Sequence, residues 1–526
     1  MSQKTLYYFS SLLRSCASVL AISPAKQTHT QILVHGFLPN VIHQTYLLLA
    51  YSKCAFLREA RYVFDIMAER NMHSWNILIA SYVSNSMYCD ALCIFDVFLE
   101  MGFRPDHYTL PPVIRACGGI GDVFMGKVFH GWVIRLGFEA YVVVGSSVLD
   151  FYVRIEDFVD AKRVFSGMLW KDSVVWNAMI SGSEKAGLHR EALKYFRNMN
   201  EGGVRMDSMV IPSVLQACGG DGDLIKGKEI HGQVVKSILF EGDIAVWNSL
   251  IDMYAKCGCL QDAEKVFKNM HQSNLVTWTT MISCYGIHGK GEDSLFLFKK
   301  MKDCGFEPNC VTFTAVLSSC SHSGLIDQGR RIFNSISCDY GFQPSVEHYA
   351  CMVDLLSRFG YLEEALALVK NVNLEVAASV WGALLAGCMM HKNVEIGEIA
   401  SRHLFDLEPR NPSNHVALCS IYDSLGMLDG VSRTRMMMRK LGLTKSPGCS
   451  WITIMGKTHV FYQGDQSHPL TQMMYKILAE IIKEPMLPDD CGQGNIFEAQ
   501  KRLCAQDGDG WTMLPHLKVE DDPVSF

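Results

Sequence analysis

The sequence predicts an all-α fold, an α-solenoid assembled from helix-turn-helix repeats. Two series of residues carry this prediction, because each returns at a fixed interval. The motifs WNILI, WNAMI and WTTMI begin at intervals of 101 and 102 residues, at Trp75, Trp176 and Trp278. Four cysteines that close apolar runs are spaced by 101, 101 and 102 residues: Cys16, Cys117, Cys218 and Cys320. Self-similarity at a fixed period is typical of a solenoid, and each period is long enough for about three helix pairs.

One helix pair is readable within the second period, between Ser173 and Asp207. Trp176, Met179 and Ile180 fall at i, i+3 and i+4, which is one face of a first helix. Gly187 then provides a break, because glycine accepts the left-handed conformation that ends helices. The apolar residues of the second helix also share one face: Ala192, Leu193, Phe196 and Met199. A single pair cannot bury both apolar faces, so it requires neighbours of the same kind.

Alignment of the two series divides the chain into helix pairs of three recurring lengths. A long pair is followed by a short pair and then by a pair of standard length, and one further long and short pair complete the array. The short pairs share the pattern AxxVFxxM on their second helix, where small and bulky residues alternate as close helix packing requires. The pairs are Leu6–Asn40, Val41–Asn71, Met72–Asp106, His107–Tyr141, Val142–Asp172, Ser173–Asp207, Ser208–Asp243, Ile244–Asn274, Leu275–Asn309, Cys310–Ser345 and Val346–Ala377.

Composition and charge narrow the class of protein. The chain has 526 residues, 49% of them hydrophobic, and an extended array suits this length better than a single compact core. No apolar run reaches the roughly 18 residues of a membrane span, so we expect no membrane partner. The net charge of −6 is mildly unfavourable for nonspecific nucleic-acid binding. It does not exclude RNA, because a basic groove can lie on an acidic molecule.

Cysteine usage and the first residues of the chain bear on its compartment. The 19 cysteines form no CxxC motif and follow the helical apolar pattern, so we interpret them as reduced core residues of an intracellular protein. Residues 1–58 contain no Asp or Glu and are rich in Ser, which resembles an organelle transit segment. The alternative stays open, because the repeats already begin near Leu6 and leave almost no separate presequence.

These features resemble the plant pentatricopeptide-repeat family, in its subclass with alternating long, short and standard repeats. The resemblance covers roughly residues 6–490. It rests on VVWNAMISG, SLIDMYAKCG, the GKxxHG of Gly126–Gly131 and Gly227–Gly232, and the EPN of Glu307–Asn309. Tetratricopeptide repeats have a similar period but a W-x2-L-G-x2-Y pattern that is absent here. The resemblance implies a right-handed superhelix of helix pairs.

The resemblance also implies a domain organisation. In chain order, it consists of a short N-terminal segment (1–5), eleven repeats (6–377), two E motifs (378–446), an E+ segment (447–490) and a divergent tail (491–526). Alternating residues in the E+ segment predict a short β-hairpin around Gly456. The tail matches no pattern of the family, and we expect it to be flexible.

Many relatives continue into a zinc-dependent deaminase domain that ends in Asp-Tyr-Trp (DYW). Such a centre requires His-x-Glu followed by Cys-x-x-Cys, because His and two thiolates hold zinc while Glu transfers the proton. The chain has one His-x-Glu, at His189–Glu191, which opens a solenoid helix, and it has no Cys-x-x-Cys. We therefore expect no catalytic site and no cofactor in this chain, and a deaminase supplied in trans.

Two further groups of residues are assigned to packing or to solvent. His29, His130 and His231 recur one period apart, which places them on the order of 25 Å or more from each other, since packed helices lie ~8–10 Å apart. They cannot share a metal ion, and we interpret them as packing residues. The basic run Arg433–Lys440 is interpreted as a solvated helix face, with contact to RNA or to a partner protein as the open alternative.

In the resembling family, each repeat reads one RNA base through its fifth residue, on the first helix, and its last residue, just before the next first helix. Two polar side chains can then reach the hydrogen-bonding edge of one base. Helix capping is the competing interpretation of any single pair, but six pairs in register favour RNA. The pairs are Thr45 with Asn71, Asn76 with Asp106, Ser146 with Asp172, Asn177 with Asp207, Asn248 with Asn274, and Thr279 with Asn309.

Two other sets of positions refine this interpretation. The fifth residues of three long repeats depart from the pattern, so we expect these repeats to read weakly or not at all: Pro111, Pro212 and Thr314. In the family, aliphatic groups at the second place wedge between bases, and such groups stand here at Val143, Val174 and Val276. His73 occupies the second place of its repeat, which puts stacking there in doubt.

The resulting hypothesis is a protein that binds one single-stranded organellar RNA and acts as the site-recognition factor in C-to-U editing. Its partners would be a DYW-type deaminase or other editing factors in trans. The expected compartment is the mitochondrion, with the chloroplast as the alternative. The rival functions are organellar RNA splicing, stability or translation, and a helical-repeat scaffold for proteins, which the acidic charge favours slightly. An enzyme with an unrecognised site has little support.

Overall fold

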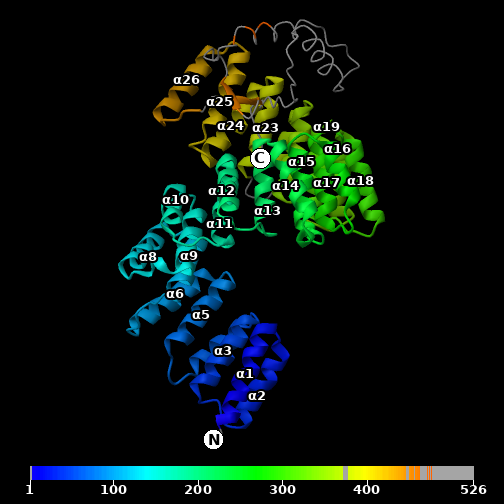
Figure 1. The fold of residues 1–526 in the computed structure, drawn as a ribbon. Helices are drawn as coiled ribbons and strands as arrows, with labels where there is room; N and C mark the ends of the chain where they lie inside the picture. The colour runs from blue at the N-terminus through cyan, green and yellow to red at the C-terminus, as the bar shows by residue number, and fades with distance from the viewer. Residues whose placement is uncertain are drawn as a thin grey trace. The chain divides into compact units, whose positions relative to one another are not determined.

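The computed structural model describes residues 3–370, 377–445, 449–454 and 457–462, and the isolated residues 471, 473 and 476. These residues fall into two compact units, Met1–His288 and Gly289–Phe526. Within each unit antiparallel helix pairs follow one another in chain order (Figure 1), and the boundary between the units falls between the two helices of the repeat Leu275–Asn309. The predicted α-solenoid of helix-turn-helix repeats is therefore confirmed.

Each pair has a first and a second helix. The first helices are α1 (Gln3–Val19), α3 (Val41–Lys53), α5 (Met72–Ser84), α7 (Leu110–Ile120), α9 (Val142–Arg154), α11 (Ser173–Lys185), α13 (Val210–Asp221), α15 (Ile244–Lys256), α17 (Leu275–Ile287), α19 (Cys310–Ser323), α21 (Val346–Arg358), α23 (Ala378–His391) and α25 (Pro412–Ser424). The second helices are α2 (Ile22–Val34), α4 (Leu57–Asp65), α6 (Tyr88–Glu100), α8 (Val123–Arg135), α10 (Phe158–Gly167), α12 (His189–Glu201), α14 (Leu224–Lys236), α16 (Leu260–Asn269), α18 (Gly291–Asp303), α20 (Ile326–Cys338), α22 (Leu362–Lys370), α24 (Val394–Leu407) and α26 (Leu428–Lys440). Two 3-10 turns precede α9 and α15: η1 (Phe138–Ala140) and η2 (Ile238–Phe240).

The first helices form a continuous layer within each unit. In the first unit every first helix contacts the next one, from α1 to α17, and in the second unit the same holds from α19 to α25. The second helices from α2 to α16 and from α20 to α24 instead contact their own first helix and the first helix that follows. Within each unit the first helices thus present a continuous surface, and the side chains on it come from consecutive repeats.

Most first helices begin where the alignment of repeats predicts, and two begin later. Helix α7 begins at Leu110 rather than His107, and α13 begins at Val210 rather than Ser208. Both carry proline, which has no N–H and is tolerated only in the first turn of a helix. The start of each helix therefore moves toward Pro111 and Pro212. At the N-terminus, α1 begins earlier than predicted, at Gln3 rather than Leu6.

The two recurring motifs of the sequence meet in the core. The Trp of each standard pair packs edge-on against the Phe of the AxxVFxxM pattern in the preceding short pair. The ring centroids lie 4.7, 4.8 and 5.3 Å apart, in the pairs Trp75–Phe64, Trp176–Phe165 and Trp278–Phe267. The apolar residues predicted to line the helix pair between Ser173 and Asp207 are all buried, and Gly187 has φ 71°, as its role as a break requires.

The GKxxHG motif joins a long pair to the short pair that follows. A Cβ at Gly126 would lie 2.1 Å from the Phe151 ring, so only glycine permits this approach of α8 to α9. Next to it, Lys127 pairs with Asp157 at 3.0 Å. Nδ1 of His130 lies 2.8 Å from the Tyr152 hydroxyl, within hydrogen-bond distance.

The same histidine contact recurs in each of the first three periods. His29 lies 2.9 Å from the Tyr51 hydroxyl, and His231 lies 2.8 Å from that of Tyr254. Burial lowers the pKa of all three histidines, so their neutral forms are favoured. Each periodic histidine therefore makes its own contact between repeats.

The cysteines correct one expectation. The periodic series is buried, and the cysteines from Cys16 to Cys419 are free thiols. Five others are exposed, so the interpretation of all cysteines as core residues is wrong: Cys89, Cys93, Cys304, Cys310 and Cys338. Cys89 and Cys93 lie one turn apart on the exposed face of α6, where apolar periodicity gives no information about a small side chain.

The predicted hairpin is present. Strands β1 (Cys449–Ile454) and β2 (Lys457–Tyr462) pair antiparallel, with Ile454 opposite Lys457 at the turn. Gly456 itself, most of the predicted E+ segment beyond the hairpin and the tail 491–526 lie outside the described residues. The domain boundaries remain predictions. Among the described helices, none combines the length and apolar character needed to span a membrane.

Candidate nucleic-acid interface

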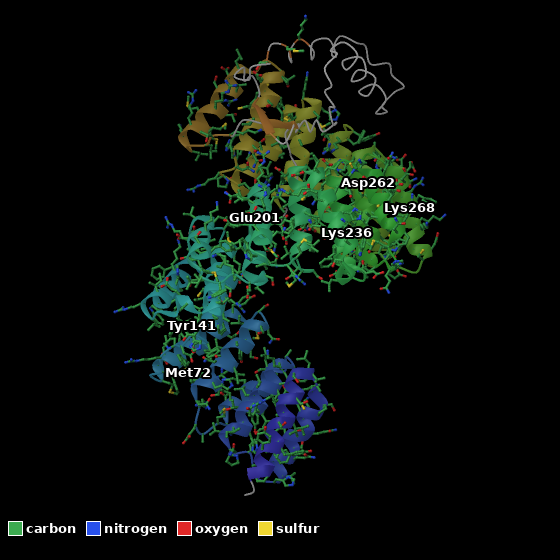
Figure 2. The ribbon with its side chains drawn as sticks, viewed as in Figure 1. Met72, Tyr141, Glu201, Lys236, Asp262 and Lys268 are labelled. Carbon is green, nitrogen blue, oxygen red and sulfur yellow. The ribbon has the colours of Figure 1, made fainter. Side chains whose placement is uncertain are left out.

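The predicted fifth residues occupy one equivalent place in the layer of first helices. Each is the fifth residue of its helix, one turn beyond the helix start, because these helices begin at the first residue of their repeats. Met72 and Tyr141, at the starts of α5 and α9, are labelled in Figure 2. The fifth residues are Thr45 in α3, Asn76 in α5, Ser146 in α9, Asn177 in α11, Asn248 in α15 and Thr279 in α17.

The predicted last residues lie at the N-terminal ends of the following first helices. Four of them are the N-caps themselves: Asn71 of α5, Asp172 of α11, Asn274 of α17 and Asn309 of α19. Asp106 and Asp207 precede the later starts of α7 and α13 and bond to backbone N–H groups there. Thr279 lies in the first unit and Asn309 in the second.

Capping fixes which atom of each last residue remains available. Oδ1 of Asp172 accepts from the Val175 N–H at 3.0 Å, and Oδ1 of Asn71 accepts from the Ser74 N–H at 2.8 Å. Asp then retains a second carboxylate oxygen, which is an acceptor, whereas Asn retains its amide NH₂, which is a donor. Asp and Asn therefore cap equally well but present opposite hydrogen-bonding chemistry beyond the cap.

The fifth residues are of two chemical kinds. The hydroxyls of Thr45 and Ser146 donate to the carbonyls of Val41 and Val142, each at 2.7 Å, so they retain only acceptor capacity. The asparagines differ, because Oδ1 of both Asn177 and Asn248 is buried without a hydrogen-bond partner among the described residues. A buried acceptor without a donor costs about 1–3 kcal/mol, so a ligand that donates a hydrogen bond would be stabilised there.

One fifth residue directly contacts the last residue of its own repeat. Asn76 Nδ2 donates to Asp106 Oδ1 at 3.2 Å, across 30 positions of sequence. Burial raises the pKa of Asp106, but hydrogen bonds from the Thr109 hydroxyl, from the N–H groups of Tyr108 and Thr109, and from Asn76 outweigh it and leave the pKa below its usual value. Asp106 is therefore ionised at neutral pH and acts only as an acceptor.

Apolar side chains at the second place are exposed beside these polar residues. Val143, Val174 and Val276 are 60%, 63% and 58% exposed, although they lie in the first turns of well-packed helices. His73 is exposed at the same place. Sequence reasoning missed five further large side chains that are exposed at this place: Tyr7, Ile42, Tyr108, Met209 and Val311. Each of them is the second residue of its repeat, and this shared position could have identified them from the sequence.

The long repeats are of two kinds. Pro111 is the second residue of α7 and is buried, and Pro212 lies in the first turn of α13, so neither presents a polar group at the fifth place. Thr314 differs from them, because it is the fifth residue of α19 and its hydroxyl donates to the Cys310 carbonyl at 3.1 Å. This arrangement matches that of Thr45 and Ser146.

The other candidate groups lie on second helices. His189 lies against Gly220, where an added Cβ would approach the ring within 2.4 Å, and Glu191 pairs with Lys162 at 2.6 Å. Within the part of the chain that the structure describes, no three His, Cys, Asp or Glu residues are grouped to hold a metal ion. The basic run lies on α26, where Arg433, Arg435, Arg439 and Lys440 are exposed.

Family models match several parts of the chain. The model described as "PPR repeat" matches residues 73–103, 174–204, 245–275 and 311–339, and "PPR repeat family" matches 273–322. The model described as "E motif" matches residues 391–453.

Curated proteins of Arabidopsis thaliana are similar over most of the chain. Pentatricopeptide repeat-containing protein At4g33990 is 37% identical over 473 residues, which are 90% of this chain and 57% of that protein. The mitochondrial protein At3g26782 is 37% identical, and the match covers 90% of this chain and 73% of that protein. The chloroplastic protein At3g57430 is 36% identical, with 94% and 58% covered. The chain thus spans between about half and three quarters of the length of these relatives.

A solved structure supports the fold alone. The crystal structure of the pentatricopeptide repeat protein PPR10, known from maize, in complex with an 18-nt psaJ RNA element aligns with a TM-score of 0.50 and 15% identity. The alignment covers 82% of this chain and 74% of PPR10. Together with the relatives above, the repeat motifs and the paired helices show that this chain belongs to the pentatricopeptide repeat family.

Proposed function

We propose that this chain is a sequence-specific single-stranded RNA-binding protein of a plant organelle. The observation that carries the proposal is the register of three kinds of side chain along the layer of first helices. Polar fifth residues, capping last residues and exposed apolar second residues recur at the same helix ends. Two polar groups suit the edge of a base, and an exposed apolar group suits its face.

The atoms left free by capping account for base preference where the fifth residue is a hydroxyl. Ser146 offers an acceptor and Asp172 offers a second acceptor, which together match the N1–H and amino donors of guanine. Thr45 offers an acceptor and Asn71 offers a donor, which match the amino donor and the N1 acceptor of adenine. The small hydroxyl side chains also leave room for a purine.

The longer asparagines at the fifth place suit the smaller pyrimidines. Beside Asp207, Asn177 can donate to a uracil carbonyl while the carboxylate accepts from N3–H. Beside Asn274, which presents a donor, Asn248 fits either pyrimidine. By resemblance to the family, the chain runs parallel to the RNA, and the eleven repeats read 5′-N-A-U-N-G-U-N-Y-A-N-N-3′.

The finer function is site recognition in C-to-U editing. The match to an E motif over residues 391–453 supports this assignment, as does the resemblance of the following segment to E+. The deaminase acts in trans. The family register places the repeat Val346–Ala377 opposite the fourth nucleotide upstream of the edited C, so three unread nucleotides separate the string from that C. We assign the protein to the mitochondrion, with the chloroplast as the alternative.

The rival functions make different demands on the same surface. A factor for splicing, stability or translation would use the same base contacts but would have no need of E-type helix pairs. A protein-binding scaffold would fit the net charge of −6 but would not require the fifth and last residues to stay in register.

Filter binding separates an RNA reader from a scaffold. Purified chain should bind an RNA that carries the string more tightly than an RNA with purines and pyrimidines exchanged at the read positions. Each mismatch should weaken binding by about 1–3 kcal/mol at one fixed salt concentration. Equal binding of both RNAs would contradict sequence-specific reading.

Sequencing of organellar RNA from plants that lack the protein separates editing from the other RNA functions. The expected result is the loss of one C-to-U conversion, at a C preceded by the string and three further nucleotides. An unspliced or depleted transcript with normal editing would assign the protein to the rival class.

A further inference from the structure

Two standard repeats carry the same predicted pair, Asn with Asp, yet their surroundings differ. In one repeat Asn76 and Asp106 are followed by Thr109, three positions after the aspartate. In the other, Asn177 and Asp207 are followed at the same distance by Val210 rather than threonine. Thr109 and Val210 are both fully buried at 0% exposure, so neither contacts solvent and each can act only on its neighbours.

Thr109 contacts both members of the first pair. Its hydroxyl lies 2.7 Å from Asn76 Oδ1 and 2.8 Å from Asp106 Oδ1, so its one proton has two acceptors in reach. The same oxygen accepts from the Asp106 N–H at 3.2 Å. The Asp106 carboxylate only accepts, so the Asn76 atom 3.2 Å from Asp106 Oδ1 must be the donor Nδ2. The amide oxygen of Asn76 then faces the Thr109 hydroxyl, which is the donor within 2.7 Å of it.

We infer that Thr109 is a positioning residue that fixes the amide orientation of Asn76 and so sharpens base selection by this repeat. The inference rests on the proposed RNA-binding function. Asp106 Oδ1 is occupied by Asn76 Nδ2 at 3.2 Å and by the N–H groups of Tyr108 and Thr109 at 2.8 Å. What remains for a base is one N–H of Asn76 and Oδ2 of Asp106. With Asp106 Oδ2 opposite N3 of the base, this donor beside an acceptor matches the carbonyl and N3–H of uracil. In the same placement it opposes cytosine, whose N3 is an acceptor.

In the second pair the aspartate makes the same capping bonds, but no hydroxyl fixes the orientation of the asparagine amide. Asp207 Oδ1 accepts from the N–H groups of Met209 and Val210, each at 3.0 Å. Asn177 Oδ1 is buried and has no hydrogen-bond partner among the described residues, since Val210 has no hydroxyl to offer. The Asn177 amide can therefore turn either its oxygen or its nitrogen toward a base. Only Asp207 then distinguishes uracil from cytosine, and the repeat is the less selective of the two.

The test measures the preference for U over C at the third and sixth nucleotides of the string, which face these two repeats. Filter binding at one salt concentration compares RNAs that differ at one of these nucleotides. In the wild-type chain the U/C affinity ratio should be about 2–10 times larger at the third nucleotide than at the sixth, as one hydrogen bond implies. Thr109→Val, which keeps the shape but removes the hydroxyl, should lower the ratio at the third nucleotide to that at the sixth.

Two further variants separate positioning from a merely structural role. Thr109→Ser keeps the hydroxyl and should keep the wild-type ratio. Val210→Thr should raise the ratio at the sixth nucleotide and leave the third unchanged, and it does not depend on the stability of Thr109→Val. Equal ratios at the two nucleotides in the wild type would overturn the inference. So would a Thr109→Val chain that weakens all RNAs equally with the ratio preserved. Absence of RNA binding by the wild-type chain would instead overturn the proposed function.

Discussion

The indole of Trp176 meets the ring of Phe165 edge-on, with ring centroids 4.8 Å apart. Trp176 belongs to the motif that recurs in standard repeats, and Phe165 to the motif that recurs in short repeats. The two motifs thus form the two sides of one interface. They share a period because the same contact recurs in each cycle of repeats. Edge-on aromatic pairs are worth about 0.5–1.5 kcal/mol beyond the area they bury.

Trp176→Ala should destabilise the middle of the array by roughly 3–5 kcal/mol, because it removes a buried aromatic side chain. Repeats couple only to their neighbours, so the damage should stay local. Hydrogen exchange measures this, and amides of α10 to α12 should exchange faster while those of α1 to α4 do not.

Trp170→Ala is the matched control, because Trp170 is 77% exposed in the loop before α11. Its effect on stability should be within about 0.5 kcal/mol. Exchange that accelerates equally over all described helices in Trp176→Ala would contradict a solenoid with nearest-neighbour coupling.

The histidine contacts between repeats predict a pH dependence of stability. Burial lowers the pKa of His130, and Glu139 and Asp160 offset part of this effect. Since the unfolded histidine titrates near 6.5, the unfolded state binds more protons below that pH. The stabilising contribution of neutral His130 is therefore complete above about pH 6.5 and is lost as pH falls toward the lowered pKa.

The measurement is the change in melting temperature between pH 7.5 and 5.5. His130→Gln retains a polar group for Tyr152 but does not titrate, so its melting temperature should fall less than that of the wild type, by on the order of 2 °C. His271→Gln removes an exposed histidine and should behave as the wild type. A His130→Gln chain with the full wild-type loss would contradict this account.

Much of the fold was predictable because local chemistry and periodicity point to the same helix starts. Asn71, Asp172 and Asn274 are N-caps, and in each case the predicted repeat begins at the next residue. The starts of α7 and α13 were misplaced, because alignment by period carries no information about how a proline shifts the first turn. The exposed cysteines of α6 were misassigned because a small apolar residue fits either face of a helix.

The candidate site was predictable only at the level of residue types. The fifth and last residues recur in register, so their offsets can be read from the sequence alone. The role proposed for Thr109 cannot be read from the sequence, because it depends on a 2.7 Å contact with Asn76, which lies 33 positions earlier. The sequence shows only a threonine near the start of a helix. Its contact with the preceding repeat becomes visible only when the two repeats are packed together.

The isolated chain should not deaminate RNA, with or without added zinc. Its one His-x-Glu is engaged elsewhere, since Glu191 pairs with Lys162 at 2.6 Å and the sequence has no Cys-x-x-Cys to complete a zinc site. The measurement is the conversion of C to U in an RNA that carries the string, with purified protein alone. Turnover by this protein would contradict the assignment of the deaminase to a partner in trans.

Asp172→Asn should move the preference at the fifth nucleotide of the string from G toward A. Asn caps helices as well as Asp does, so Oδ1 should keep its bond to the Val175 N–H, which is 3.0 Å long in the wild type, and stability should change little. What changes is the free atom, from a carboxylate oxygen that accepts from guanine to an amide that donates to N1 of adenine. The discrimination should shift by about 1–3 kcal/mol, as for other contacts to base edges.

The measurement is a binding series on four RNAs that differ only at that nucleotide, at one salt concentration. Asp122→Asn is the matched control, because Asp122 caps the second helix α8, with its carboxylate accepting from the Met125 N–H at 3.0 Å. It lies outside the layer of first helices, so its base ranking should equal that of the wild type. If wild type and Asp172→Asn rank the four bases identically, the register proposed for the repeats is wrong even though RNA is bound.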